Sequence, residues 1–231
     1  MRRRILNNNR AVPLAALAAA FLLSSCGTLS FLEPRQRAPL RATGDPAVVS
    51  LRAKLVEGAN SLLGKKTLEV RGRKFSYDCS GTVLAIYWYA GVDLARDYPR
   101  YTGNGVARIF KSLDAAGLLY DSVYPMTGDL VFWDNTYDAN EDGVWNDVLS
   151  HIGMVVSTAE DGTVSYVHHH LRRGIVIEFM NLREPGVNQR ELRGVTRTLN
   201  SPMRAAEEGR PRPTLWLSGQ LYRILGMGYL Y

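Results

Sequence analysis

The spacing of hydrophobic residues changes partway along the chain. In the first half, apolar side chains recur every three or four residues, which is the period of a helix with one buried face. This spacing predicts helices over residues 46–64 and 105–116, and a continuous apolar run over residues 82–90 predicts a buried helix over 79–90. Asp45 followed by Pro46 is typical of a helix start, and Asp78 and Gly91 suit the two residues that flank the second helix. We therefore expect the first half to be mainly helical.

The second half has short apolar runs rich in β-branched and aromatic residues. These runs predict strands over residues 128–133, 151–156, 164–168 and 174–179. Asp161-Gly162 is typical of a hairpin turn between the second and third of these strands. Strands joined by short turns pair antiparallel, so residues 46–231 are predicted to form one α+β domain with helices packed on the sheet. We expect residues 183–213 to be a polar excursion and the aromatic tail, 215–231, to pack in the core.

The N-terminus has the pattern of an export signal. Residues 2–10 are basic, and the apolar run that follows is shorter than the roughly 20 residues that span a bilayer as a helix. Leu23-Ser24-Ser25-Cys26 resembles the lipobox of bacterial lipoproteins, in which the signal is removed before the cysteine and that cysteine is lipidated. The resemblance implies a signal peptide over residues 1–25, a lipid on Cys26 and a tether over residues 26–45.

Localisation and charge argue against a nucleic-acid partner. Gly27, and not aspartate, follows the predicted lipidation site, which in many Gram-negative lipoproteins directs the chain to the outer membrane, facing the periplasm. The formal net charge is +6, but four arginines lie in the predicted signal peptide without an acidic residue, so the chain from Cys26 onward carries +2. The remainder has no basic stripe interleaved with aromatic residues, which excludes nucleic acid as the expected partner.

Cys79 is the strongest candidate for chemistry. It lies in the first turn of the second predicted helix, where unpaired N–H groups and the helix dipole favour an anion, so we expect the pKa of its thiol to be lowered. The chain has one other cysteine, Cys26, and if that residue carries lipid, Cys79 has no disulfide partner in an oxidising compartment. The alternative is a small buried hydrophobic residue, the usual role of a free cysteine. An unpaired exported thiol favours catalysis.

All four histidines lie within residues 151–170. A thiol nucleophile needs a base to take its proton and a third group to orient that base. His151, at the start of a predicted strand, suits the base, and the predicted hairpin brings His168 close enough to orient it. His168 and His170 share one face of their strand, and we expect no chemical role for His169.

A zinc site is the alternative interpretation of these residues. Cys79, His151 and either His168 or His170 are ligand types that zinc accepts. No pair among them has the close CxxC or HxxxH spacing of common zinc motifs. The sequence therefore favours the catalytic interpretation.

Four short motifs occur in the order found in a known family. They are Asp78-Cys79-Ser80-Gly81, Gly128-Asp129-Leu130-Val131-Phe132, His151-Ile152-Gly153-Met154 and Tyr166-Val167-His168. They resemble the successive motifs of NlpC/P60 cell-wall peptidases, over about residues 46–180. The resemblance implies a papain-like α+β fold with Cys79 as nucleophile, His151 as base and His168 as the orienting residue. It also implies hydrolysis of peptidoglycan stem peptides, commonly between D-glutamate and the diamino acid, and we expect no required cofactor.

Three residues beside the predicted nucleophile are candidates for substrate binding. Tyr77 is placed to line the cleft, to donate a hydrogen bond to the oxyanion, or only to pack. Asp78 is expected to cap the helix and is also a candidate to bind a substrate amine, while Ser80 contributes its backbone. Residues 62–66 replace the Tyr-rich, Gly-Gly segment that many family members have before the cysteine. The resemblance thus supports the chemistry more firmly than the substrate.

An insertion over residues 134–150 precedes the predicted base. Within it, Asp138, Asn140 and Asp142 match the alternate oxygen ligands of a D-x-N-x-D-G calcium loop. The twelfth position is Leu149, so the usual bidentate carboxylate is missing. The sequence leaves open a structural calcium ion or an ordinary acidic turn.

Two other functions remain open. An N-acyl amidase or transferase would use the same residues on another amide, and a non-catalytic cell-wall-binding lipoprotein would keep the fold only for docking. Docking has no use for an unpaired thiol. The sequence therefore predicts a lipid-anchored cysteine peptidase of the cell envelope, with peptidoglycan as its partner.

Overall fold

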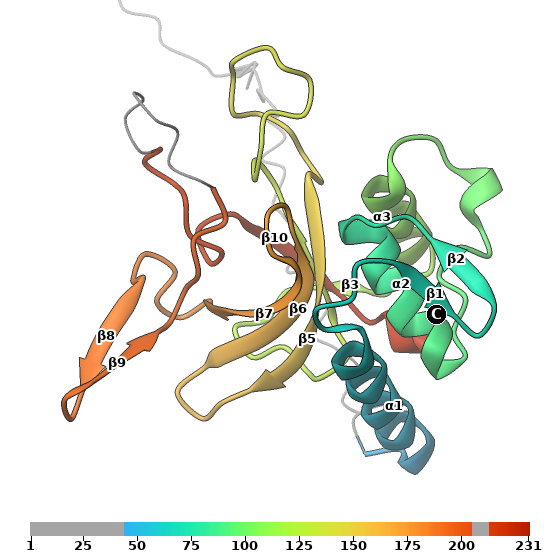
Figure 1. Cartoon of the computed structure of the whole chain (residues 1–231), viewed down its shortest axis with the longest axis horizontal. Coiled ribbons are helices and arrows are strands. Elements are labelled where there is room, and N and C mark those ends of the chain that lie inside the picture. Colours follow the sequence, from blue (N-terminus) through green and yellow to red (C-terminus); the bar gives the residue numbers. More distant parts are fainter. Residues whose placement is uncertain (1–43, 205–212) are drawn as a thin grey trace, which may run out of the picture. The chain divides into compact units, whose positions relative to one another are not determined.

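Side-chain caps mark the helix starts. The computed structural model describes residues 44–204 and 213–231, and within them the chain forms three α-helices beside a six-stranded sheet (Figure 1). The helices are α1 (Pro46–Leu62), α2 (Cys79–Ala90) and α3 (Gly105–Ala115), with two short 3-10 helices, η2 (Tyr98–Arg100) and η3 (Gly228–Leu230). Asp45, Asp78 and Asn104 each accept a first-turn N–H at 2.7 to 2.8 Å. All three predicted α-helices are confirmed.

The strands of the main sheet pair antiparallel in the order β3-β10-β4-β5-β6-β7. They are β3 (Leu119–Tyr120), β4 (Leu130–Trp133), β5 (His151–Thr158), β6 (Thr163–His170), β7 (Gly174–Asn181) and β10 (Tyr222–Gly226). Separate two-stranded ladders join β1 (Leu68–Val70) to β2 (Arg73–Phe75) and β8 (Gln189–Leu192) to β9 (Val195–Thr198). The predicted α+β class is confirmed.

Within the main sheet, the sequence pattern predicts four strands that follow one another along the chain. The four predicted runs correspond to β4, β5, β6 and β7, and the predicted turn at Asp161-Gly162 joins β5 to β6. The pattern does not predict β10, which comes from the aromatic tail and pairs between β3 and β4. It also misses the β8–β9 hairpin, because most side chains of that hairpin are exposed and show no buried face.

The main core lies between α2 and the sheet. α2 packs against β5 and β6, while α1 and α3 contact α2 (Figure 1). Val83 and Ile86 of α2 are fully buried, as are Ile152 and Met154 of β5. Burying one side chain of this size stabilises the fold by about 1.5–3 kcal/mol. This packing holds the first turn of α2 beside the first residues of β5.

Residues 1–43 lie outside the part of the chain that the structure describes. The predicted signal peptide, the lipid on Cys26 and nearly all of the tether fall there, so these stay predictions. Over residues 44–204 and 213–231, no helix is long and apolar enough to cross a membrane.

Asp129, just before β4, is a buried carboxylate. The Tyr120 hydroxyl and the Met126 N–H, the latter at 2.5 Å, both donate to its Oδ2 atom, while Oδ1 has no hydrogen-bond partner among the described residues. Burial raises the pKa of Asp129 to about 7, although the bonds from Tyr120 and Met126 lower it. Asp129 therefore takes up a proton in the folded protein near neutral pH.

The Asp129→Asn variant tests this pKa. Since the pKa is about 7 in the folded protein and ordinarily 3.8, the resulting stabilisation is complete at low pH and is lost as the pH rises through about 7. Asparagine keeps the acceptor oxygen but cannot ionise. The free energy of unfolding of the wild type minus that of the variant should fall by up to about 4 kcal/mol as the pH rises from about 4 to about 8. Urea unfolding curves measure this difference, and a pH-independent difference would contradict the raised pKa.

Candidate active site

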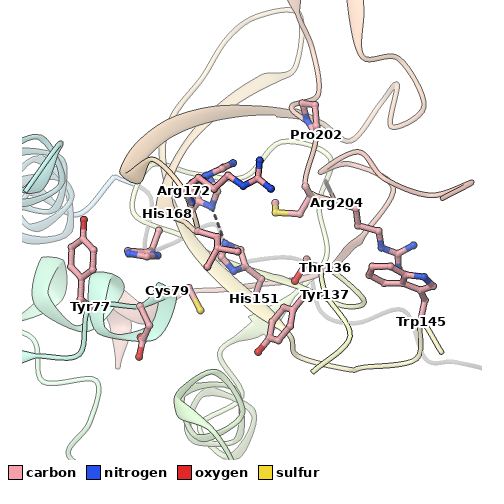
Figure 2. Close-up of a pocket in the computed structure, with 15 residues that line it drawn as sticks. Tyr77, Cys79, Thr136, Tyr137, Trp145, His151, His168, Arg172, Pro202 and Arg204 are labelled. Atoms are coloured by element: carbon pink, nitrogen blue, oxygen red, sulfur yellow. Dashed lines mark hydrogen bonds between the residues drawn. The ribbon is translucent and has the colours of Figure 1, made fainter. Parts of the chain in front are cut away.

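A cavity of about 630 Å³ joins the start of α2 to two strands of the sheet. Cys79 lines it from α2, His151 from the first residue of β5 and His168 from β6 (Figure 2). Figure 2 shows Cys79 and His151 in the middle of the view, with Tyr77 toward one end of the cavity and Trp145 toward the other. The residues predicted as nucleophile, base and orienting residue therefore share one cavity.

The first turn of α2 fixes the position of Cys79. The Asp78 carboxylate accepts the Gly81 N–H at 2.7 Å and the Ser80 hydroxyl at 2.8 Å. A Cβ on Gly81 would lie 1.9 Å from the carbonyl oxygen of Ser76, so only glycine lets the preceding chain pass this close. Local geometry thus explains three residues of the Asp-Cys-Ser-Gly sequence: Asp78 caps the helix, Ser80 bonds the cap, and Gly81 permits the close approach of the chain.

The pairing of β5 with β6 places both histidines on one face of the sheet. Gly153 pairs with His168, and His151, two residues before Gly153, projects to the same face. The His151 Nε2 and His168 Nδ1 atoms lie 2.8 Å apart. A Cβ on Gly153 would lie 2.8 Å from the Val167 carbonyl oxygen and 3.3 Å from the His168 Cβ, so glycine leaves room for this arrangement. The predicted proximity of the two histidines is confirmed.

Glu178 of β7 is a site residue that the sequence analysis does not identify. Its Oε2 atom lies 3.0 Å from the His168 Nε2 atom, and its Oε1 atom accepts a hydrogen bond from Arg173. Glu178 and His168 are both buried. Because Glu178 pairs with Tyr166, it lies diagonally across from His168 on the same face of the sheet. Its signal in the sequence is a single carboxylate within the apolar run 174–179.

The expectation that the thiol pKa is lowered is wrong. Burial raises the pKa of Cys79 to about 11, and the charge of Asp78 adds to this, although the backbone N–H groups of Ile152, Ser80 and Cys79 itself lower it. The N–H groups at the helix start thus lower the pKa of Cys79 as expected, but burial raises it by more. Removing a thiolate from water disfavours it more than these N–H groups favour it.

The environment of His151 also disfavours charge. Burial, and then the nearby histidines His168, His169 and His170, hold the pKa of His151 well below its ordinary value. With the Cys79 pKa above neutrality and the His151 pKa below it, both groups are uncharged at pH 7. His151 can then take the thiol proton as a general base during attack, and no thiolate–imidazolium pair exists beforehand.

The candidate substrate-binding residues divide into two groups. Tyr77 and Asp78 line the cavity, whereas Ser80 is not among its described lining residues. The Tyr77 hydroxyl donates to the Lys65 carbonyl oxygen at 2.7 Å, so it is engaged away from any oxyanion. The Tyr77 ring meets His169 edge-on, with ring centroids 4.5 Å apart. Tyr77 and His169 therefore act as a wall of the cavity.

The insertion forms a second wall together with the segment after β9. Tyr137 and Trp145 line the cavity from the insertion, and Arg204 lines it from the later segment (Figure 2). The buried Arg204 guanidinium lies 4.1 Å from the centroid of the Trp145 ring, donates to the Leu215 carbonyl at 2.8 Å and also bonds the Asn135 carbonyl. Neither Trp145 nor Arg204 can be identified from the sequence, because only the fold brings these distant segments together.

The predicted calcium ligands lie in an exposed turn of the insertion. Asp138 accepts the N–H groups of Asp142 and Gly143 at 3.2 and 2.8 Å, and the Asn140 amide donates to Asp142 at 2.9 Å. Across the described ranges, 44–204 and 213–231, no group of three or more His, Cys, Asp or Glu side chains is placed to hold a metal ion. Calcium binding at this turn stays a prediction.

The zinc alternative fits this arrangement poorly. His168 uses one ring nitrogen toward His151 and the other toward Glu178. Neither nitrogen is then left to bind a metal ion. The alternative set with His170 is also not placed to hold a metal ion among the described residues. The geometry therefore favours the interpretation in which His168 orients the base.

The Asp78→Asn variant tests the electrostatics of the thiol. Asparagine also caps helices, but it removes a negative charge that raises the pKa of Cys79, so the thiolate fraction should increase. We expect the rate of alkylation by iodoacetamide at about pH 8 to rise about threefold to tenfold. In the wild type, the rate should still be rising above about pH 9, because the pKa is about 11. A rate that is already constant near neutral pH would instead indicate a preformed thiolate.

Comparisons with known proteins leave the assignment to the geometry of the site. The features that bear on its function are the Asp-Cys-Ser-Gly turn, the histidine pair and Glu178. A scan against protein-family models finds no match for this chain, and a search of curated proteins finds none either.

Proposed function

We propose that this chain is a cysteine peptidase of the NlpC/P60 type, with a papain-like fold, that hydrolyses amide bonds in peptidoglycan stem peptides. The observation that carries the proposal is the 2.8 Å contact between His151 and His168 in the cavity that also holds Cys79. Acyl transfer by a thiol requires a nucleophile, a base within reach and a group that orients the base. The four motifs that resemble the family support the same assignment.

The proposed reaction proceeds through a thioester. The Cys79 sulfur attacks the carbonyl carbon of the scissile amide while His151 takes the thiol proton. The C–N bond then breaks as His151 gives this proton to the leaving amine. A water molecule, losing its proton to His151, attacks the thioester and releases a carboxylic acid and the free thiol. His168 holds the His151 ring in position throughout.

Backbone N–H groups at the start of α2 are the proposed oxyanion donors. The N–H groups of Cys79 and Ser80 are close enough to the sulfur to lower its pKa. The next N–H in the turn, that of Gly81, is already bonded to Asp78. Each oxyanion donor in such a site is worth about 3–4 kcal/mol of transition-state stabilisation.

The substrate follows from the family resemblance. By this resemblance, the cleaved bond is the one between D-glutamate and the diamino acid. Asp78 lines the cavity, and we assign to it the binding of a substrate amine. A lipid on Cys26 would hold the enzyme at the outer membrane, facing the periplasm, where peptidoglycan lies. The reaction as written needs no cofactor.

An N-acyl amidase or transferase is the second candidate. Tyr137, Trp145 and Met203 give the cavity a mostly aromatic and apolar wall, which suits an acyl chain or a planar group as well as a peptide. Such an enzyme would use Cys79 and His151 in the same way. A non-catalytic wall-binding lipoprotein is less well supported, because docking requires no thiol beside a histidine pair.

A peptidoglycan digest tests the proposal. The purified full-length chain is incubated in detergent with purified peptidoglycan, in parallel with its Cys79→Ala variant, and the fragments are identified by mass. The wild type should release new amine ends between D-glutamate and the diamino acid. Removing the nucleophile of such a site lowers the rate about 10⁶-fold, so the variant should give no detectable product.

Other outcomes decide against the peptidase. Release of an acyl group from an amide outside the stem peptide, abolished in Cys79→Ala, would favour the amidase. Peptidoglycan binding that persists in Cys79→Ala, with no product from the wild type, would favour the docking module.

A further inference from the structure

Four side chains link the surface of the protein to the proposed base. Arg173 bonds the Glu178 Oε1 atom, the Glu178 Oε2 atom lies 3.0 Å from the His168 Nε2 atom, and the His168 Nδ1 atom lies 2.8 Å from the His151 Nε2 atom (the last contact is dashed in Figure 2). His168 and Glu178 are buried, whereas Arg173 is half-exposed. The inference below rests on the proposed roles of Cys79 and His151, but not on which amide is cleaved.

Glu178 is ionised in this arrangement. Burial by itself would raise the pKa of Glu178, but the hydrogen bond from His168 and the charge of Arg173 outweigh it and hold this pKa below its ordinary value. An ionised carboxylate can only accept hydrogen bonds. The proton in its 3.0 Å contact with His168 therefore sits on the His168 Nε2 atom.

The proton on the His168 Nε2 atom determines which nitrogen of His151 is protonated. In the proposed resting state His168 is a neutral imidazole, which carries one proton, so with Nε2 protonated it offers a lone pair at Nδ1. The hydrogen bond to the His151 Nε2 atom then requires a proton on that atom. His151 is left with its lone pair on Nδ1, which is the nitrogen available to take the Cys79 proton.

We propose that Glu178, held by its bond to Arg173, is a positioning residue that sets the tautomers of both histidines, so that His151 presents an unprotonated Nδ1 atom to the thiol. The proton transfer that this favours breaks the S–H bond of Cys79 and forms an N–H bond at His151 Nδ1, giving a thiolate and an imidazolium. The Glu178 charge stabilises the imidazolium through His168, because screening is weak inside the protein.

The other titratable and charged groups near these four side chains do not change the placement of the protons. Around Glu178 these are His168, the Tyr166 hydroxyl at 3.4 Å, the Arg173 guanidinium and the His170 ring. Around His151 and Cys79 they are Asp78, Tyr137, His168, His169 and His170. Of the carboxylates in the described ranges, only Glu178 bonds to either member of the histidine pair, so the proton order depends on it.

The Glu178→Gln variant separates positioning from packing. Glutamine has nearly the same shape, but its amide can donate as well as accept, so it no longer enforces one tautomer. Glu184→Gln is the matched control, since Glu184 also pairs with an arginine, Arg190, but does not line the cavity. Nitrogen-15 NMR of the histidine rings in the full-length chain reports the tautomers without any substrate, and iodoacetamide alkylation reports the reactivity of Cys79.

In the wild type, both His151 and His168 should carry their proton on Nε2. Glu178→Gln should give mixed tautomers and slow alkylation at about pH 7 by roughly tenfold, equivalent to about one pKa unit in the basicity of the histidine pair. Arg173→Gln should shift the alkylation rate in the same direction but less, and Glu184→Gln should leave it unchanged.

The wild-type spectrum alone can overturn the inference. A proton on the His168 Nδ1 atom would do so even if Glu178→Gln does not fold. A folded Glu178→Gln variant with wild-type tautomers and alkylation rates would show that Glu178 acts only in packing. If the expected spectra appear but peptidoglycan is not cut, the proposed substrate is wrong and the role of Glu178 stands.

Discussion

The pairing of β5 with β6 is the constraint on which the site depends. Gly153 opposite His168 puts the two histidine rings on one face, 2.8 Å apart. A slip of one residue would turn His168 to the other face of the sheet. Met154 and Val167, which also pair in this ladder, are fully buried and oppose such a slip. The chemistry therefore depends on a register that the hydrophobic core maintains.

The burial that fixes this geometry also decides which groups are charged. Burial raises the pKa of Cys79 and lowers that of His151, so the reacting pair is neutral at rest. Glu178 keeps its charge because His168 donates a hydrogen bond to it and Arg173 lies against it. A buried charge with two partners next to a neutral pair can direct a proton without a preformed ion pair.

The cavity walls come from parts of the chain that are distant in sequence. Arg204 holds the insertion in place through Trp145 and the Asn135 carbonyl, and it also bonds the Leu215 carbonyl. The tail then adds β10 between β3 and β4. The shape of this cavity thus depends on contacts between segments that are distant in sequence.

By itself, the sequence determined the elements whose signals are local. Asp78 and Gly91 delimit α2, and short apolar runs with the Asp161-Gly162 turn indicate the β5–β6 hairpin. Together these signals identify Cys79, His151 and His168 as one candidate set. Tertiary structure decided what depends on non-local contacts: the insertion of β10, the wall built on Arg204, the bond from Glu178 to His168, and the direction of the Cys79 pKa shift. Capping and periodicity act over a few residues and can be read from spacing, whereas desolvation and cross-strand hydrogen bonds depend on which distant side chains surround a group once the core has formed.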